Sequence, residues 1–357
     1  MKKILLLSPS NPFYKGGVSI FVKNITHYIS SNYEIDVVYP NTSNTFLQIN
    51  KNTNYIGLKI LNIPILNNLL FMLRLLFRVG KQNYDLIIDN TGYSFVFGKK
   101  YKKVIIAHGS HYENLKARKI KGIYSFFGWV AMFILTIYQK YGIIFSYKTI
   151  AISKKVKNEL IENYNIKDSE KINIISNGTL YEYGEDEIHI LLKKRLGNRV
   201  CFISTDHSWK GIGIIEKLAV SNPRIEFIIC GYDYKPKQKN VNYIGLLNEN
   251  ELKDIMLLSD VFLLPSKYEG QSLAILDAMA CGLPIITYKK SDPSIGTDIG
   301  YIVNSLEWKD YDFVIKEIFK DKHKREKISI NNALLMKKYI WLNQGNQYLS
   351  LIKEILG

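Results

Sequence analysis

Residues 260–288 of the chain, DVFLLPSKYEGQSLAILDAMACGLPIITY, decide how the rest of the sequence is interpreted. The apolar run from Val261 to Leu264 is typical of a buried strand, and a proline follows it. A short loop with one acid, Glu269, comes next, and a helical pattern then runs to Gly282 before another proline. The segment therefore predicts a strand, a loop and a helix, with Glu269 at the carboxyl end of the strand.

The start of this helix offers donors to an anion. The backbone N–H groups of Gln271, Ser272 and Leu273 have no partner within the helix, so we expect them to point into the crevice at the strand's end. A second acid, Asp277, follows Glu269 by eight residues and lies about two turns into the helix, on roughly the same face. The loop and the first helical turns are therefore expected to form one side of an anion site.

This block resembles the signature of the group 1 (family 4) retaining nucleotide-sugar glycosyltransferases, which have the GT-B fold. Their signature has two glutamates with seven residues between them. The chain has Glu269-Gly270 and places Asp277 where the family usually has its second glutamate. The resemblance implies an α/β protein with two Rossmann-like domains that face each other across a cleft, and a C-terminal helix that crosses back to the first domain.

Weaker matches to the same family follow in the expected order along the chain. Gly16 and Gly17 match a glycine loop whose backbone approaches the donor diphosphate, and His108 ends a strand as the family's histidine does. Lys210, which precedes a glycine, matches a phosphate-binding lysine, and Trp341 matches the region where the last helices cross back. Several ordered matches in addition to the strong one make a chance resemblance improbable.

The resemblance also implies a role for each residue. Glu269 would contact the donor sugar, Lys210 the diphosphate, and Asp277 the ribose, whose diol gives a carboxylate two hydrogen bonds. His108 would bind or deprotonate the acceptor hydroxyl, and His111 is a weaker candidate for the same role. The alternatives are a solvated helix acid, a surface lysine and a structural histidine, respectively, for Asp277, Lys210 and His108.

One position departs from the family pattern. The family usually places an arginine five residues before its lysine, and here Thr205 stands in that position. Either Lys210 acts with hydroxyl and helix-terminus donors, or the donor is bound differently. The expected catalytic residues are Glu269, His108 and Lys210, and the expected donor-binding residues are Gly16, Gly17, Thr205, Lys210, Glu269, Gly270, Gln271, Ser272, Leu273 and Asp277.

Length and pattern predict two domains. A chain of 357 residues exceeds one comfortable core, and its short apolar runs alternate with helical stretches, as in α/β proteins with parallel sheets. A polar stretch follows Gly178, and a new apolar strand begins at Val200. We therefore expect an acceptor-binding domain over 1–178, a donor-binding domain over 179–340 and a C-terminal helix over 341–357 that packs on the first domain.

The charge is divided unevenly between these parts. Residues 1–178 hold 24 Lys and Arg against 9 Asp and Glu, a net charge of +15, whereas 179–357 hold 24 against 23. Such a surface attracts nucleic acid or anionic lipid. Apolar segments with neighbouring cations, 66–79 and 116–138, favour a lipid interface and argue against nucleic acid.

The segment 122–138 carries no charge, yet it is shorter than the roughly 20 residues that span a bilayer. We expect it to lie on an anionic membrane surface; the alternative is a helix buried in the core. Met1 leads directly into a short strand without the apolar run of a signal peptide, so a cytoplasmic protein, peripheral on the inner face of the cell membrane, is expected. Three scattered cysteines indicate buried thiols, and no metal or cofactor is expected.

The sequence thus predicts a retaining, metal-independent glycosyltransferase. The donor would be a nucleotide-sugar, in the first place a UDP-sugar, and the acceptor a glycan or a lipid-linked sugar in cell-envelope polysaccharide or glycoconjugate synthesis. Retaining hydrolases use two close carboxylates, whereas here a mechanism in which the leaving phosphate deprotonates the acceptor fits better. Two alternatives stay open: a nucleotide-sugar epimerase or hydrolase of the same fold, and a catalytically degenerate binding protein.

Overall fold

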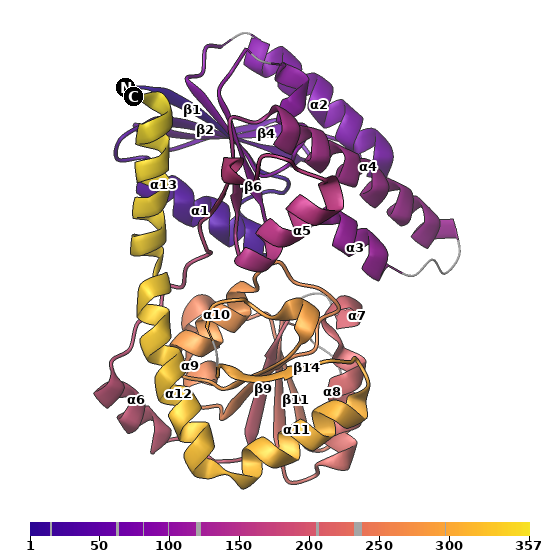
Figure 1. Ribbon diagram of the computed structural model, residues 1–357, viewed down its shortest axis with the longest axis vertical. Helices are drawn as coiled ribbons and strands as arrows, with labels where there is room; N and C mark the ends of the chain where they lie inside the picture. Colours follow the sequence, from indigo (N-terminus) through magenta and orange to yellow (C-terminus); the bar gives the residue numbers. More distant parts are fainter. Residues whose placement is uncertain are drawn as a thin grey trace. The chain divides into compact units, whose positions relative to one another are not determined.

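A computed structural model describes the chain except for residues 15, 62–63, 81, 99, 119–122, 205–206, 232–237 and 297. The chain divides into two compact units, Met1–Asn177 with Leu342–Gly357, and Gly178–Trp341. Each unit is built on its own largely parallel sheet with helices on both faces (Figure 1). The two predicted Rossmann-like α/β domains are therefore confirmed.

The sheet of the first unit has eight strands in the order β3-β4-β2-β1-β5-β6-β7-β8. Its core strands are short apolar runs because both faces are covered. The β3–β4 pair is antiparallel, and the other strand pairs of this sheet are parallel. The strands are β1 (Lys3–Leu7), β2 (Glu34–Asn41), β3 (Thr45–Asn50), β4 (Thr53–Lys59), β5 (Leu86–Asp89), β6 (Lys103–Ala107), β7 (Lys148–Ala151) and β8 (Ile172–Ile174).

The helices of the first unit cover both faces of this sheet. Five of them connect strands: α1 (Gly17–Ile29), α2 (Pro64–Gly80), α3 (His111–Ala117), α4 (Ile123–Phe145) and α5 (Lys154–Tyr164). Short 3-10 turns η1 (Tyr93–Phe97) and η2 (Ser169–Lys171) complete the connections. Helices α2 and α4 contact each other and lie side by side in Figure 1.

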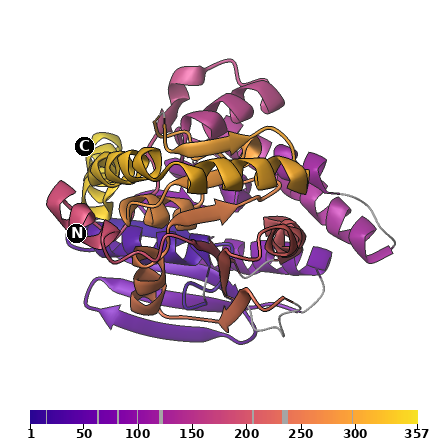
Figure 2. The same ribbon diagram turned by 90° about the horizontal axis from the view of Figure 1, so that it is seen from below.

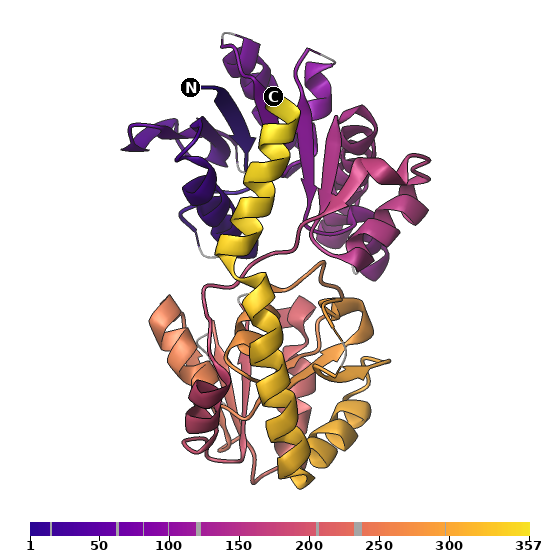
Figure 3. The same ribbon diagram turned by 60° about the vertical axis from the view of Figure 1, so that its left-hand side comes forward.

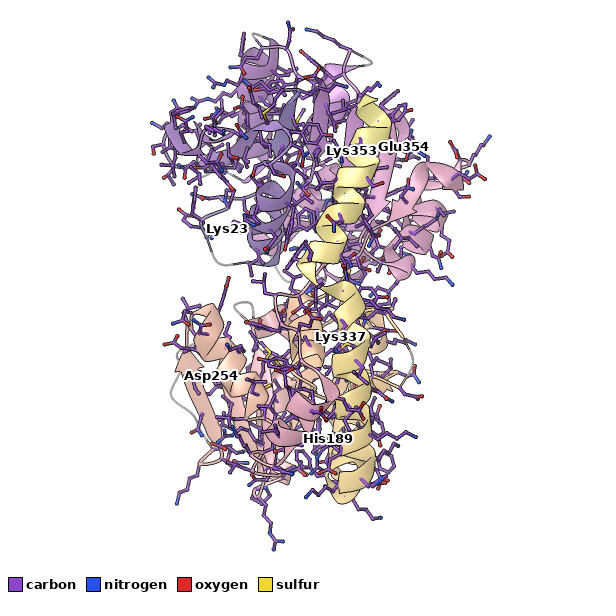
Figure 4. The ribbon with its side chains drawn as sticks, turned by 90° about the vertical axis from the view of Figure 1, so that its left-hand side faces the viewer. Lys23, His189, Asp254, Lys337, Lys353 and Glu354 are labelled. Atoms are coloured by element: carbon purple, nitrogen blue, oxygen red, sulfur yellow. The ribbon has the colours of Figure 1, made fainter. Side chains whose placement is uncertain are left out.

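The last helix, α13 (Trp341–Leu356), returns to the first unit and packs on α1 (Figure 3). The ring of Tyr348 meets that of Phe21 edge-on at 5.8 Å between centroids. Gly345 permits this approach, because a Cβ there would lie 2.5 Å from the ring of Tyr28. On the outer face, Lys353 and Glu354 are exposed to solvent (Figure 4). The helix thus buries an apolar face and keeps a polar one outward.

The sheet of the second unit has six parallel strands in the order β11-β10-β9-β12-β13-β14. The strands are β9 (Arg199–Ile203), β10 (Glu226–Cys230), β11 (Val241–Gly245), β12 (Val261–Leu264), β13 (Ile285–Tyr288) and β14 (Gly300–Val303). Counted along the chain, this is the 3-2-1-4-5-6 order of dinucleotide-binding folds. Ligands bind such sheets where the strand order reverses, here between the carboxyl ends of β9 and β12.

The helices of the second unit complete this fold. They are α6 (Glu185–Leu192), α7 (His207–Lys210), α8 (Ile212–Ser221), α9 (Glu249–Leu257), α10 (Leu273–Ala280), α11 (Trp308–Lys320) and α12 (Lys322–Met336), with 3-10 turns η3 (Lys289–Ser291) and η4 (Lys337–Tyr339). The three cysteines are buried free thiols. Cys201, Cys230 and Cys281 all belong to the apolar core of this unit.

Helix α4 differs from the prediction for 122–138. Its apolar stretch, Phe126–Phe145, has 20 residues, which by length and composition is enough to cross a membrane. The predicted segment was therefore too short, because Lys140 interrupts the apolar run without ending the helix. Only 22% of the stretch's most apolar 18-residue window is buried, which contradicts the alternative of a helix buried in the core.

Candidate functional site

Two charged side chains meet at the point where the strand order of the second sheet reverses. Lys210 ends the short helix α7 after β9, and Glu269 lies in the loop after β12. The Nζ of Lys210 donates to Oε1 of Glu269, and the two side chains, 24% and 13% exposed, form an ion pair. The structure thus brings two of the predicted catalytic residues together at the position where such sheets bind ligands.

The backbone of the two loops explains why this ion pair forms. Gly211 has φ +86°, and a Cβ there would lie 2.6 Å from the carbonyl oxygen of Pro265, so only glycine fits this close approach. The indole Nε1 of Trp209 donates to the carbonyl of Tyr268 at 3.1 Å, and the Lys267 N–H donates to the carbonyl of Trp209 at 3.1 Å. These contacts join the loops after β9 and β12 and hold the lysine against the glutamate.

The predicted anion donors lie at the start of α10. Ser272 is the residue before the first helical position, and its carbonyl accepts from the Leu276 N–H at 3.2 Å. Gln271 is buried and donates from Nε2 to the carbonyl of Pro293 at 3.3 Å, which fixes the loop beside the helix. The Glu269 N–H donates to the carbonyl of Lys290 at 3.1 Å. Gly270 and Gln271 therefore complete the loop after the glutamate, and the helix begins at Leu273.

Asp277 has a partner that the sequence did not suggest. The hydroxyl of Thr179 donates to its Oδ1 at 2.7 Å. Burial raises the pKa of the Asp277 carboxyl to about 7, the Thr179 hydrogen bond opposes this shift, and the charge of Glu249 adds to it. Thr179 itself pairs through its backbone with Tyr339 and Trp341 at 2.9 and 3.0 Å. Asp277 therefore contacts the start of the second unit, at Thr179.

In the first unit, His108 follows β6 and is oriented by a residue after β5. The Nδ2 of Asn90 donates to the carbonyl of Leu7 at 2.9 Å, so its Oδ1 faces Nε2 of His108, 3.0 Å away. Because that oxygen can only accept, Nε2 is assigned the proton and Nδ1 is left as an acceptor. Burial, with a smaller contribution from the charge of His111, lowers the pKa of His108 to about 4. The imidazole is therefore neutral at physiological pH.

Gln139, which the sequence analysis missed as it missed Asn90, holds the loop after His108. Gln139, on the inner side of α4, accepts from the His111 N–H at 2.8 Å and donates to the carbonyl of Gly109 at 2.8 Å. The hydroxyl of Tyr164 donates to the same amide oxygen at 2.6 Å. Burial also lowers the pKa of His111 to about 4. The one available signal was a glutamine within an apolar helix, where a buried amide needs partners.

The remaining predicted residues are placed as follows. Gly17 begins α1. Apart from its chain neighbours, no atom of the described residues lies within 4 Å of the position that a Gly16 Cβ would take, so the backbone there is open to approach. Thr205 lies outside the described residues. Within the described part of the chain, no group of three or more His, Cys, Asp or Glu side chains is arranged to hold a metal ion.

Comparisons with known proteins agree with this arrangement. Residues 185–334 match the model of the family described as glycosyl transferases group 1, and residues 15–179 match glycosyltransferase family 4. An uncharacterised glycosyltransferase of Methanocaldococcus jannaschii is 30% identical over 76% of each chain. A UDP-Gal:alpha-D-GlcNAc-diphosphoundecaprenol alpha-1,3-galactosyltransferase of Escherichia coli is 25% identical over 63% of each chain.

The fold has a similar counterpart among solved structures. A sucrose-phosphate synthase from Thermosynechococcus elongatus superposes with a TM-score of 0.83, at 15% sequence identity, over 99% of each chain. At this identity the likeness concerns the fold alone. The GT-B fold implied by the sequence resemblance is therefore confirmed.

Proposed function

Since this chain belongs to the group 1 glycosyltransferases, we propose that it transfers a sugar from a UDP-sugar to a glycan or lipid-linked acceptor with retention of configuration. The observation that carries the proposal is the Lys210–Glu269 ion pair where the strand order of the second sheet reverses. A nucleoside diphosphate brings charge that a preorganised lysine stabilises, and the leaving group gains charge as the bond to the sugar breaks.

Lys210 and Glu269 would divide the donor between them. Lys210 would bind the diphosphate together with the N–H groups that begin α10, and Glu269 would bind hydroxyls of the transferred sugar. Without donor, the two side chains neutralise each other. Donor binding would give each of them a new partner, so neither charge is left without compensation.

The environment of Glu269 supports a mechanism without a covalent sugar–enzyme intermediate. A lysine, rather than a second carboxylate, pairs with this glutamate. In the proposed step, the acceptor oxygen forms the new bond to the anomeric carbon, the bond from that carbon to the phosphate oxygen breaks, and the acceptor proton passes to the leaving phosphate. His108 would accept a hydrogen bond from a substrate hydroxyl at Nδ1 and would stay neutral throughout.

The nature of the substrates is inferred from one relative and one surface. The name of the Escherichia coli relative specifies a UDP-sugar donor and a diphosphoundecaprenol-linked acceptor. An apolar stripe runs along the outer side of α4, and its members are 38 to 45% exposed: Phe126, Phe133, Ile137, Tyr141 and Ile144. Their spacing places them on one helical face. Together with the net charge of +15 of residues 1–178, this supports a protein that lies on the anionic inner face of the cell membrane.

The transfer is tested by incubating the protein with UDP-sugars and a lipid-diphosphate-linked sugar. We expect UDP release that depends on the acceptor, and a product with the anomeric configuration of the donor. The variant Glu269→Gln serves as the control for background hydrolysis. Donor consumption without a coupled product would favour the epimerase or hydrolase, and failure to bind any nucleotide would favour the degenerate binding protein.

The membrane location is tested by co-sedimentation with vesicles that contain anionic lipid. Replacing Phe126 and Phe133 with serine should release the protein from the vesicles. The matched control replaces Phe313 and Leu196, which are 67% and 63% exposed on the second unit, and it should leave binding unchanged. Equal binding by the two double variants would contradict the assignment of the α4 surface.

A further inference from the structure

An open groove of about 550 Å³ lies between the β3–β4 hairpin and helix α2 in the first unit. Its rim carries two phenylalanines that are largely in solvent, Phe46 at 64% and Phe77 at 72% exposure, and Ile56 is buried at its base. Figure 2 shows the hairpin at the edge of the sheet. The volume is in the range of sites for small ligands.

Two arginines of α2 also line this groove. Arg74 and Arg78 are four residues apart, so they project from the same face of the helix one turn apart, and both are half-buried. Arg74 makes a long contact of 3.5 Å with Oδ1 of Asn44. The Nε of Arg78 is buried without a hydrogen-bond partner, and in the described part of the chain neither arginine forms an ion pair with an acid.

This arrangement has an energetic cost in the absence of an anion. Like charges at this spacing destabilise a helix. A buried donor without a partner adds a further cost. One bound anion would compensate the two neighbouring positive charges, because two guanidinium groups can hold a phosphate through several charge-assisted hydrogen bonds.

We propose that this groove is a discrete binding site for the phosphate of an anionic phospholipid. The arginines would hold the phosphate, and the acyl chains would lie over Phe46 and Phe77 toward the membrane. The adjoining surface of α2 is apolar as well, since Leu73 and Leu76 are exposed beside Phe77. A free phosphate would leave these apolar side chains in water, whereas a lipid covers them.

The groove is separate from the residues that the proposed function uses. It lies at β3 and β4, and His108 follows β6, four strands away from β4 in the sheet. At ~4.8 Å per strand, the separation is about 19 Å. The inference rests on the proposed membrane location and adds a specific lipid site to it, without any assumption about the transfer chemistry.

The experiment uses titration calorimetry of the full chain with dioctanoyl phosphatidylglycerol below its micelle concentration. We expect saturable binding with one lipid per chain. The double variant Arg74→Gln/Arg78→Gln should weaken the affinity at least tenfold, and Phe77→Ser should weaken it several-fold. Glycerophosphoglycerol, which has the same phosphodiester headgroup without the acyl chains, should not bind over the same concentration range.

Matched variants separate this site from a general effect of charge. Lys322→Gln/Lys327→Gln removes two exposed cations from the second unit and should leave lipid affinity unchanged. If the arginine double variant does not fold, Arg74→Lys/Arg78→Lys keeps the charge but loses the bidentate geometry, and its affinity should fall as well. Turnover of a UDP-sugar with a water-soluble acceptor should be unaffected in either arginine variant, so a failure here is distinct from failure of the proposed transfer.

Three results would overturn the proposal. Unchanged lipid affinity in folded arginine variants would place the lipid elsewhere. Equal losses in the arginine and lysine double variants would mean unspecific attraction by net charge. If glycerophosphoglycerol bound as tightly as the lipid, the groove would be a simple phosphate site and the acyl chains would make no contribution.

Discussion

The two sheets present opposite kinds of chemistry at the carboxyl ends of their strands. The second unit has a charged pair, Lys210 with Glu269, whereas the first unit has a neutral pair, His108 with Asn90. A leaving diphosphate needs charge to stabilise it, but an acceptor hydroxyl is neutral and needs only an oriented hydrogen-bond acceptor. The difference between the pairs therefore corresponds to the difference between the two proposed substrates.

The neutral state of the first pair depends on burial. His108 packs edge-on against Phe21, with ring centroids 4.6 Å apart, and its pKa of about 4 keeps the ring unprotonated. The charged pair of the second unit is held by loop contacts made around Gly211 and Trp209. In both units, the residue with a proposed catalytic role follows a strand, and a residue from a neighbouring strand's end holds it in place.

The largest effect is expected from removing the charge of the second pair. Lys210→Ala should lower kcat about 100- to 1,000-fold, the usual cost of a lost preorganised donor. It should also weaken UDP binding far more than uridine binding, because the lost contact is to phosphate. Steady-state kinetics and calorimetry with both ligands measure this.

Glu269→Gln is the companion variant to Lys210→Ala. It should lose turnover while UDP affinity stays close to that of the unmodified protein, because its proposed contacts are to the sugar. If Lys210→Ala weakened UDP and uridine equally, Lys210 would not be a phosphate ligand. Near-normal turnover by a folded Glu269→Gln protein would remove the glutamate from the proposed mechanism.

A smaller effect is expected when the orientation of the neutral pair is broken. Asn90→Leu leaves Nε2 of His108 without its acceptor, so the ring is free to adopt the other tautomer. We expect kcat/KM for the acceptor to fall about 10- to 100-fold, less than the roughly 100- to 10,000-fold contribution of a full general acid–base catalyst. The KM for the donor should hardly change, and the pH–rate profile should show no inflection near 6.5.

The control is Asn90→Asp, which keeps an acceptor oxygen toward His108. It should retain more activity than Asn90→Leu and raise the pKa of the histidine, because a carboxylate stabilises the imidazolium. Equal losses in both variants would indicate a structural role for Asn90 and none in orienting the ring.

The sequence predicted the charged pair better than the neutral one, for a physical reason. Glu269 belongs to a compact local pattern, strand, loop and helix, that sequence periodicity reveals. Asn90 is 18 residues from His108, and Gln139 is 30 residues from Gly109, so only the folded sheet brings each pair together. The groove of Arg74 and Arg78 could not be predicted for the same reason, because its other wall is the β3–β4 hairpin, which is distant in the sequence.

The length of α4 was missed for a related reason. A charge at Lys140 looks like the end of an apolar segment, but on a helix it can lie beside the apolar stripe while the backbone continues to Phe145. On the inner side of the same helix, Gln139 forms hydrogen bonds to the backbone of the loop after His108. Helix α4 therefore has an apolar outer face and, on its inner side, a polar side chain that binds the loop after His108.

Gln139→Leu tests that inner support. The variant leaves the Gly109 carbonyl, the His111 N–H and the Tyr164 hydroxyl without their buried partner. Unpaired buried polar groups cost about 1–3 kcal/mol, so the free energy of unfolding should fall by that order. Denaturant titration measures the loss, and Gln139→Glu, which keeps the acceptor oxygens, is the matched control. An unchanged stability would mean that the loop does not depend on α4.

The smallest effect is expected at Asp277. This acid of the second unit resembles the His108–Asn90 pair of the first unit, because it is largely uncharged below about pH 7. Its carboxyl has an ordinary pKa of 3.8 and a pKa of about 7 in the folded chain, mainly through burial. Between these two values the folded state holds a proton that the unfolded state has lost, so the free energy of unfolding falls as pH rises. Above pH 7 both states are ionised and the penalty is constant.

Asp277→Asn removes this penalty and keeps an oxygen for the Thr179 hydroxyl. The variant should therefore gain stability relative to the unmodified protein as pH rises from about 4 to about 7, and the difference should then level off. We expect a gain on the order of 1 kcal/mol, because water near a partly exposed carboxyl reduces the effect. Melting temperatures at pH 4.5, 6 and 8 measure it. If the stability difference between the variant and the unmodified protein did not change with pH, Asp277 would be ionised throughout this range. It would then belong with the charged pair of the second unit.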